Sequence, residues 1–215
     1  MTAPDPTLIF RFIHIDNLRG CLKQGGLYAP NHCPDDGKMY RTIHNVDVQN
    51  KRHEISIPCG PGGTIHDYVP FYFGYLSPMM LNLRTGKVPG YEEGQAPLIY
   101  LVTTAQAVRD RGAGFVFSNG YGLATFTDWS DDLAVLDKVD WDMVYQRYWS
   151  DTLADMDRQR RKQAEFLVHR FCDWSLIQVI GVINQDMKRR VEEILAGHPD
   201  GLHKPVVVKA EWYYY

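Results

Sequence analysis

The order of strand-like and helix-like segments is the feature that most restricts how this chain can fold. Apolar strand patterns occur at residues 8–13, 97–102 and 176–183, separated by helical patterns and by long polar stretches. A doubly wound parallel sheet needs strict alternation of strands and helices, whereas a mixed order is typical of α+β proteins. The sequence therefore predicts an α+β fold, with a mixed β-sheet core, flanking helices and long loops.

Proline, glycine and polar runs predict where this pattern is interrupted. Pro70 lies in the aromatic segment 68–76, which predicts an edge strand or an irregular strand. Residues 28–53 are polar and have no sustained period, so we expect a long loop, which in a compact domain is usually functional or disordered. Further strands are predicted at 115–117 and 205–213, with helices before Gly25 and Gly112, helical pieces that include 141–149, and a helix at 185–196.

Size and charge limit the class of protein. A chain of 215 residues with 45% hydrophobic residues suits one domain with a substantial core, which we expect to span residues 1–215. The net charge of -3 and the pI of about 6.2 argue against a broadly basic nucleic-acid binder but allow a local basic groove. Aromatic side chains make up 13% of the chain and can stack on bases and nicotinamide rings as well as fill a core.

The cysteines and the amino terminus favour a cytoplasmic setting. The chain starts without the pattern of a signal peptide, and no apolar run reaches the roughly 18 residues that a spanning helix needs. We therefore expect a cytoplasmic protein with no membrane association. Four scattered cysteines without a C-x-x-C pair are interpreted as reduced core residues: Cys21, Cys33, Cys59 and Cys172.

Common nucleotide and metal motifs are missing from the sequence. No G-x-G-x-x-G opens a helix after a strand, and there is no Walker A lysine motif, so neither a Rossmann site nor a P-loop is predicted. The histidines of the first third of the chain lack metal-ligand spacing, and no metal is expected.

One acidic residue stands among apolar residues in the segment 161–168. If this segment is a strand, alternation puts Phe166 on one face and Glu165 with Leu167 on the other. A helix with Glu165 on its solvated face is the alternative, because a short apolar run does not separate the two. On a strand beside a cleft, the carboxylate could stabilise a developing cation or act as a base.

Three blocks of sequence together resemble the DarT family of DNA ADP-ribosyltransferase toxins. They are His14-Ile15-Asp16-Asn17-Leu18, the segment 61–81 with Tyr-Val-Pro-Phe-Tyr-Phe and Ser-Pro-Met, and Lys-Gln-Ala-Glu-Phe-Leu-Val at 162–168. The resemblance implies an ADP-ribosyltransferase-like sheet with long active-site loops and transfer of ADP-ribose from NAD to thymidine or guanosine in single-stranded DNA. It also implies a toxin–antitoxin pair, with a macrodomain antitoxin of the DarG type as partner.

The resemblance assigns roles to individual residues. Glu165 matches the catalytic glutamate, which holds a ribose hydroxyl and stabilises the oxocarbenium-like charge. Arg52 matches an arginine that contacts NAD and helps to activate the base nitrogen, a role that needs an unusual environment because arginine normally stays charged. The other assigned residues are Arg11, Phe12, Ile13, Gly20, Tyr28 and Tyr72 for NAD, and Lys51, Met79 and Arg84 for the acceptor.

The first strand departs from the family pattern. Family members usually begin Tyr-His-Ile-Thr or Tyr-His-Phe-Thr, whereas this chain reads Phe10-Arg11-Phe12-Ile13. Arg11 is the predicted replacement for the histidine that holds NAD, and a salt-bridged edge residue is the alternative. The change leaves an NAD-binding module with lost catalysis open as a function, and the acidic net charge leaves a transferase of protein or RNA open.

Two stretches are expected to surround the site. Residues 34–53 should close over NAD, and residues 118–160 should shape the target site. The basic cluster 158–162 either contacts DNA phosphates or forms a solvated face beside Asp155 and Asp157.

Overall fold

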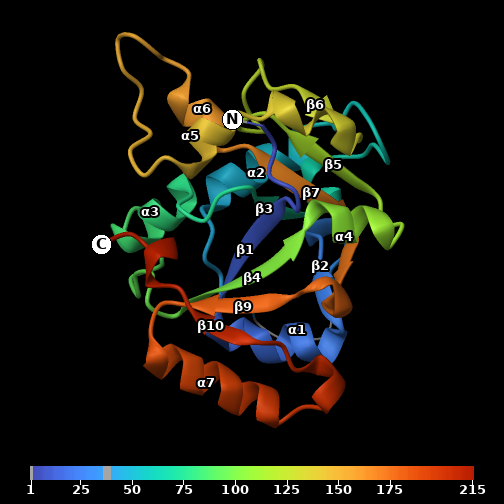
Figure 1. Cartoon of the computed structure of the whole chain (residues 1–215), viewed down its shortest axis with the longest axis vertical. Coiled ribbons are helices and arrows are strands. Elements are labelled where there is room, and N and C mark those ends of the chain that lie inside the picture. The colour runs from blue at the N-terminus through green and yellow to red at the C-terminus, as the bar shows by residue number, and fades with distance from the viewer. Residues whose placement is uncertain (1, 36–39) are drawn as a thin grey trace.

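A mixed β-sheet surrounded by helices forms the body of the molecule (Figure 1). The computed structural model describes residues 2–35 and 40–215. The strands are β1 (Leu8–His14), β2 (Gly26–Tyr28), β3 (Tyr68–Tyr72), β4 (Leu98–Thr104), β5 (Phe115–Ser118), β6 (Trp129–Ser130), β7 (Glu165–His169), β8 (Phe171–Asp173), β9 (Val179–Val182) and β10 (Val206–Val208). The helices are α1 (Leu18–Gln24), α2 (Val46–Glu54), α3 (Pro78–Arg84), α4 (Ala105–Asp110), α5 (Trp141–Tyr145), α6 (Arg158–Lys162) and α7 (Gln185–Ala196).

The main sheet has the strand order β10-β9-β4-β1-β3-β7-β5-β6. Its neighbours are antiparallel except β9 and β10, which run parallel, and β2 pairs with β8 in a small separate sheet. The predicted α+β fold with a mixed sheet is therefore confirmed.

Strand β1 lies in the middle of this sheet, and both of its faces are buried. Ile9 and Ile13 join one core cluster, while Phe10 and Phe12 join a second cluster with Tyr100. Burying each such side chain contributes roughly 1.5–3 kcal/mol to folding. A strand anchored in this way holds the residue between those side chains, Arg11, in a defined place.

Pro70 lies in β3, which is an internal strand, so the predicted edge position is wrong and the irregular strand is the better description. β3 pairs with β7 from Tyr68↔His169 to Tyr72↔Glu165, but with β1 only at Phe10↔Tyr72. A proline has no N–H to donate to a neighbouring strand. The ladder between β1 and β3 is therefore short.

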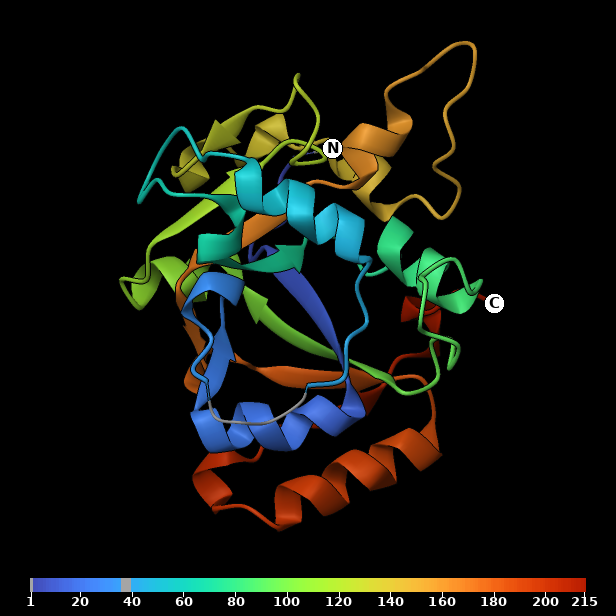
Figure 2. The same cartoon turned by 180° about the vertical axis from the view of Figure 1, so that it is seen from behind.

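The last part of the predicted long loop, from residue 46 on, is a helix. Residues 46–54 form α2, and Asn45 caps it by accepting hydrogen bonds from the N–H groups of Asp47 and Val48. The one buried residue of α2 is Arg52, so the helix has no apolar stripe for a sequence pattern to reveal. Figure 2 shows α2 crossing in front of the sheet. Residues 36–39 of the predicted closing segment lie outside the described residues.

The carboxy-terminal part follows the prediction in its helix but not in its strand. Helix α7 has the predicted bounds and buries a stripe of Met187, Val191 and Leu195. The predicted strand 205–213 is shortened to β10, followed by a 3-10 turn at Ala210–Trp212. Within the described ranges, no helix is both long and apolar enough to cross a membrane.

Candidate active site

Arg52 and Glu165 form a buried bidentate ion pair between α2 and β7. The Nη1 and Nη2 atoms of Arg52 donate to Oε1 and Oε2 of Glu165 at 2.9 and 2.8 Å. The two residues are only 8% and 3% exposed. Such pairs are strong and fixed in geometry, but the loss of hydration offsets much of the attraction, so a buried pair is weak evidence for a purely stabilising role.

The ion pair with Glu165 stabilises the protonated form of Arg52. Burial alone would lower its pKa, but the charge and hydrogen bonds of Glu165 outweigh burial, and the pKa of Arg52 is raised. A raised pKa is the opposite of what a proton-accepting arginine needs. The geometry therefore favours Arg52 as a permanent cation over the base role that the family resemblance implies.

The turn after β5 contacts both the backbone and the side chain of Glu165. The Ser118 hydroxyl accepts a hydrogen bond from the Glu165 N–H at 3.2 Å and donates to the carbonyl of Gly120 at 2.7 Å. A Cβ atom at Gly122 would lie 2.9 Å from Oε1 of Glu165, so the backbone approaches the carboxylate there as only glycine allows. Tyr121 is near enough to both members of the pair for their charges to act on its phenol.

A cavity of about 100 Å³ lies beside the ion pair. A larger hollow of about 570 Å³ lies between the amino-terminal segment and residues 131–136, away from the buried pair of Arg52 and Glu165, which lines the smaller cavity. Six of the residues assigned from the sequence meet there, namely Arg11, Phe12, Arg52, Tyr72, Met79 and Glu165, and Ile43, His44 and Pro70 complete the lining.

Arg11 extends from β1 into this cavity, and one of its N–H donors is unused among the described residues. Its Nη1 donates to the carbonyl of Pro70 at 2.9 Å, while its buried Nε has no hydrogen-bond partner among the residues that the structure describes. Burial lowers the pKa of Arg11. An unmet buried donor costs about 1–3 kcal/mol, so a ligand that accepts from Nε would recover that free energy. β1 is internal and Arg11 has no ion pair among the described side chains, which contradicts the salt-bridged edge alternative.

Aromatic and sulfur atoms also line the cavity. The rings of Phe12 and Tyr72 stack with centroids 6.2 Å apart and an interplanar angle of 9°. The Tyr72 hydroxyl donates to Sδ of Met79 at 3.8 Å. Burial, followed by the nearby charge of Glu165, raises the pKa of Tyr72, so its phenol stays neutral at ordinary pH. Aromatic faces of this kind suit a flat ring, whether it is neutral or positively charged.

The other assigned residues do not line the cavity, and their roles stay predictions. Ile13 is part of the hydrophobic core, and the ring of Tyr28 lies 4.5 Å from that of Phe171. Gly20 leaves space for Tyr40, since a Cβ atom there would lie 2.7 Å from the tyrosine ring. The two remaining residues are exposed cations, Lys51 on α2 and Arg84 at the end of α3.

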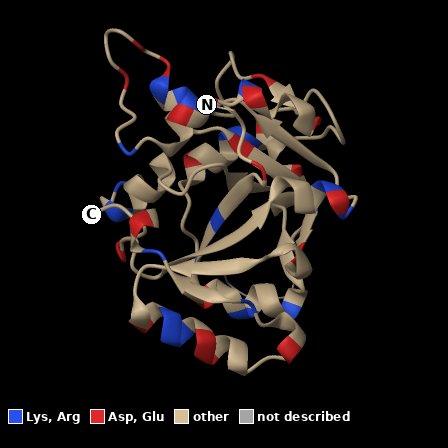
Figure 3. Ribbon diagram, in the orientation of Figure 1, with Lys and Arg blue, Asp and Glu red and all other residues tan. Residues whose placement is uncertain are grey.

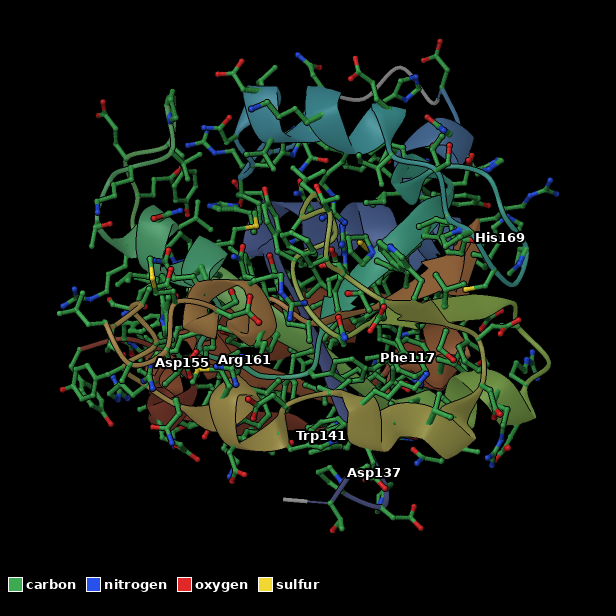
Figure 4. All side chains as sticks on the ribbon, turned by 90° about the horizontal axis from the view of Figure 1, so that it is seen from above. Phe117, Asp137, Trp141, Asp155, Arg161 and His169 are labelled. Carbon is green, nitrogen blue, oxygen red and sulfur yellow. The ribbon has the colours of Figure 1, made fainter. Side chains whose placement is uncertain are left out.

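The basic cluster on α6 donates to the protein itself. Its predicted proximity to Asp155 and Asp157 is confirmed, and Figure 4 shows Arg161 next to Asp155. Each of its four cations makes at least two hydrogen bonds or ion pairs within the protein, and contact of the cluster with DNA phosphates stays a prediction. Their partners are the carbonyls of Tyr148 and Ser150 for Arg158, Asp157 and Asn119 for Arg160, Asp140, Asp155 and Asp157 for Arg161, and the carbonyls of Val144 and Gln146 for Lys162.

Several site residues carry no signal in the sequence. His44 comes from an irregular segment, and Ser118 and Gly122 are recognisable only as turn residues until β5 is paired with β7. In the part of the chain that the structure describes, no group of three or more His, Cys, Asp or Glu side chains is arranged to hold a metal.

Comparison with known proteins gives matches over nearly the whole chain. Residues 10–214 match the family model described as "ssDNA thymidine ADP-ribosyltransferase, DarT". A DNA ADP-ribosyl transferase of Thermus sp. (strain 2.9) is 38% identical over 213 residues, which cover 99% of each chain. A DNA ADP-ribosyl transferase of Escherichia coli O127:H6 is 29% identical over 211 residues, covering 98% of this chain and 95% of the relative.

Solved structures agree with these matches. Thermus sp. 2.9 DarT in complex with ADP-ribosylated ssDNA has a TM-score of 0.93 and 37% identity, covering 100% of this chain and 99% of that one. The same protein in complex with NAD+ has a TM-score of 0.89 and 37% identity, covering 99% and 100%. Thermosipho africanus DarTG in complex with ADP-ribose shares the fold, with a TM-score of 0.75, 14% identity, and coverage of 96% of this chain and 50% of that one.

Proposed function

The chain belongs to the DarT family of DNA ADP-ribosyltransferases, and from this membership we propose that it transfers ADP-ribose from NAD to a base in single-stranded DNA. The observation that carries the proposal is the buried Arg52–Glu165 pair beside a cavity into which Arg11 brings an unused donor. The relatives bound to NAD+ and to ADP-ribosylated ssDNA support both substrates.

The residues of the cavity fit the chemical groups of NAD. Two guanidinium groups, Arg11 and Arg52, suit a diphosphate, because arginine forms charge-assisted hydrogen bonds with phosphate oxygens. The stacked rings of Phe12 and Tyr72 suit the nicotinamide. NAD supplies the ADP-ribosyl group and carries nicotinamide as the leaving group.

Glu165 is proposed as the catalytic residue. Its carboxylate is held in one orientation by Arg52 and by the Ser118 contact to its own N–H. A preorganised negative charge in a dry site stabilises positive charge that develops in the transition state, with no reorganisation at the moment of reaction. Each carboxylate oxygen that accepts from Arg52 keeps a second lone pair, which can accept from a ribose hydroxyl.

Arg52 is proposed to hold both Glu165 and NAD. Its guanidinium has five N–H donors in a fixed fork, and the two hydrogen bonds to Glu165 leave others free. Arg11 is proposed to donate to NAD in place of the histidine that other family members have at this position. Retention of the complete pair argues against a module that binds NAD without catalysis, because binding alone needs no glutamate at this position.

DNA is proposed as the acceptor in spite of the acidic net charge. Figure 3 shows acidic and basic residues interspersed along the ribbon. A short single strand needs few phosphate contacts, and the exposed cations Lys51 and Arg84 are proposed to provide some of them. The family description names thymidine, and we propose thymidine as the modified base, with guanosine as the competing acceptor.

The biological role proposed from family membership is that of a toxin. Its partner would be a macrodomain antitoxin of the DarG type, which removes the ADP-ribose mark. Co-expression supports this role if such an antitoxin relieves growth arrest that depends on Glu165, and arrest that persists without Glu165 would contradict it.

Incubation with labelled NAD tests the proposed function. The label should appear on single-stranded oligonucleotides, should require thymidine, and should decrease as salt rises, because phosphate contacts release counterions. Duplex DNA, RNA and a protein pool serve as parallel acceptors, and oligonucleotides that lack either thymidine or guanosine identify the base. Label confined to protein or RNA would replace the DNA proposal.

A further inference from the structure

Lys162 is buried without a carboxylate partner among the described residues. It ends α6 shortly before Glu165, it is 4% exposed, and its Nζ donates to the carbonyls of Val144 and Gln146 at 2.6 Å each. Lysine is almost never kept out of water unless it is paired, because a desolvated charge is unfavourable. An exception this close to the proposed catalytic residue calls for an explanation.

Helix α5 is held at both ends by neighbouring residues of α6. Arg161 pairs with Asp140, whose side chain accepts from the N–H of Met143 at the start of α5. Lys162 binds the carbonyls at the other end of that helix. A helix as short as Trp141–Tyr145 is not stable alone, so these contacts determine where it lies.

One of the two carbonyls that accept from Lys162 packs against the chain just after β3, next to a residue that lines the cavity. The oxygen of Val144 is 2.5 Å from the place where a Cβ atom of Gly74 would lie. Gly74 follows shortly after Tyr72, the cavity residue at the end of β3. Glycine at this position lets the Val144 carbonyl approach the chain that leaves β3.

The segment that follows is tied to the helix that carries Met79. Nε1 of Trp149 donates to the hydroxyl of Tyr214 at 3.0 Å, and this hydroxyl donates to the carbonyl of Leu76 at 2.8 Å. Leu76 precedes Ser77, which caps α3 and so places Met79. Contacts therefore run from Lys162, through the end of α5, to the wall of the cavity at Tyr72 and Met79.

We propose that Lys162 is a positioning residue for the acceptor side of the transfer reaction. It fixes the end of α5 and the segment 146–149 relative to the strand of Glu165, and so keeps the wall at Met79 at the right distance from the carboxylate. This inference rests on the proposed function. Arg11 and Arg52, the cations proposed for the diphosphate of NAD, lie on β1 and α2, to which Lys162 donates no hydrogen bond, so losing Lys162 should affect the acceptor more than NAD.

Three variants separate positioning from general stability. Lys162→Met keeps the length of the side chain and removes its donors, Lys162→Gln returns neutral N–H donors, and Lys23→Met is a control at an exposed lysine on α1. Lys162→Met should raise the KM for a thymidine-containing oligonucleotide about 10- to 100-fold, the effect of a small misplacement near the chemistry, with a clearly smaller loss of affinity for a non-hydrolysable NAD analogue. Lys162→Gln should recover part of the loss.

Each outcome decides the proposal. An unchanged oligonucleotide KM, or an equal loss of NAD affinity and oligonucleotide KM, would overturn it. If Lys162→Met does not fold, Lys162→Gln is measured by the same criteria. If the wild-type protein labels no oligonucleotide, the proposed function fails. The anchoring is then judged by hydrogen exchange at residues 144–149, which should be faster in the Lys162 variants, and unchanged exchange would overturn it.

Discussion

Two groups of cations in this molecule differ in what their donors do. Arg11 and Arg52 enter the cavity from β1 and α2, and within residues 2–35 and 40–215 the buried Nε of Arg11 has no partner. The cations of α6, from Arg158 to Lys162, all donate to carbonyls and carboxylates of the protein. In the sequence the second group is the denser, but in the structure the first group lines the cavity and the second does not.

The difference shows that local charge density does not identify a phosphate site. A guanidinium whose donors are satisfied by its own chain gains little from a new anion, whereas an unmet buried donor gains a full hydrogen bond. We therefore interpret the cavity group as the ligand-binding cations and the α6 group as the structural ones.

Glu165→Gln should reduce transfer at least about 10²- to 10³-fold, because one preorganised electrostatic stabiliser contributes about that much. Glutamine keeps the shape and one acceptor for Arg52, whereas alanine would leave a buried charge unpaired at a cost of about 3–5 kcal/mol in stability. Initial rates with labelled NAD and a single-stranded oligonucleotide provide the measurement, with circular dichroism as the test of folding. A folded variant with near-normal transfer would remove Glu165 from the catalytic role.

Arg11→Ala should weaken binding of a non-hydrolysable NAD analogue by about 1.5–3 kcal/mol, the range for a hydrogen bond to a charged group. Calorimetric titration measures this loss directly. Arg158→Ala, which removes a cation of the α6 group, is the matched comparison and should leave NAD affinity unchanged. Equal losses in both variants would contradict the division between the two groups.

Lys162 makes the stability of the protein depend on pH. Burial lowers its pKa to about 7, well below the usual value for lysine, so at pH above about 7 the unfolded chain binds a proton that the folded chain does not. The free energy of unfolding should therefore rise with pH from about 7 to about 10, by at most about 1.4 kcal/mol per pH unit. Urea unfolding of the wild type and Lys162→Met should show this difference, and parallel pH curves would refute it.

Lys51→Ala and Arg84→Ala should have the smallest effects. Both side chains are exposed, so each can contribute only a screened phosphate contact. We expect each to raise the KM for the oligonucleotide modestly and to reduce the slope of log affinity against log salt by about one unit or less. A salt dependence that neither variant alters would place the phosphate contacts elsewhere.

Much of the fold could be predicted from the sequence because its strands and its longest helix bury apolar residues at regular spacing. Phe166 and Val168 belong to one core cluster and Leu167 to another, as the alternation around Glu165 predicted. Helix α7 was predicted for the same reason, since its buried residues recur at helical spacing. Helix α2 was missed because it buries a charged residue and shows no apolar stripe.

The site was predictable only in part, because its geometry depends on contacts between distant segments. The resemblance to the family singled out Arg52 and Glu165, but their bidentate contact joins residues far apart in the chain. The Ser118 contact arises only when β5 lies beside β7. For the basic cluster on α6, the choice between DNA and protein partners depended on which acceptors the fold brings near it.

Hydrogen exchange with and without a non-hydrolysable NAD analogue tests the central claim most directly, because it reports on both groups of cations in one experiment. Ligand contacts at the cavity should slow exchange in β1, in residues 40–54 around Arg52, and in β7, while residues 144–162 keep their exchange rates. Protection confined to residues 144–162, with none near Arg11 and Arg52, would contradict the assignment of the cavity as the NAD site.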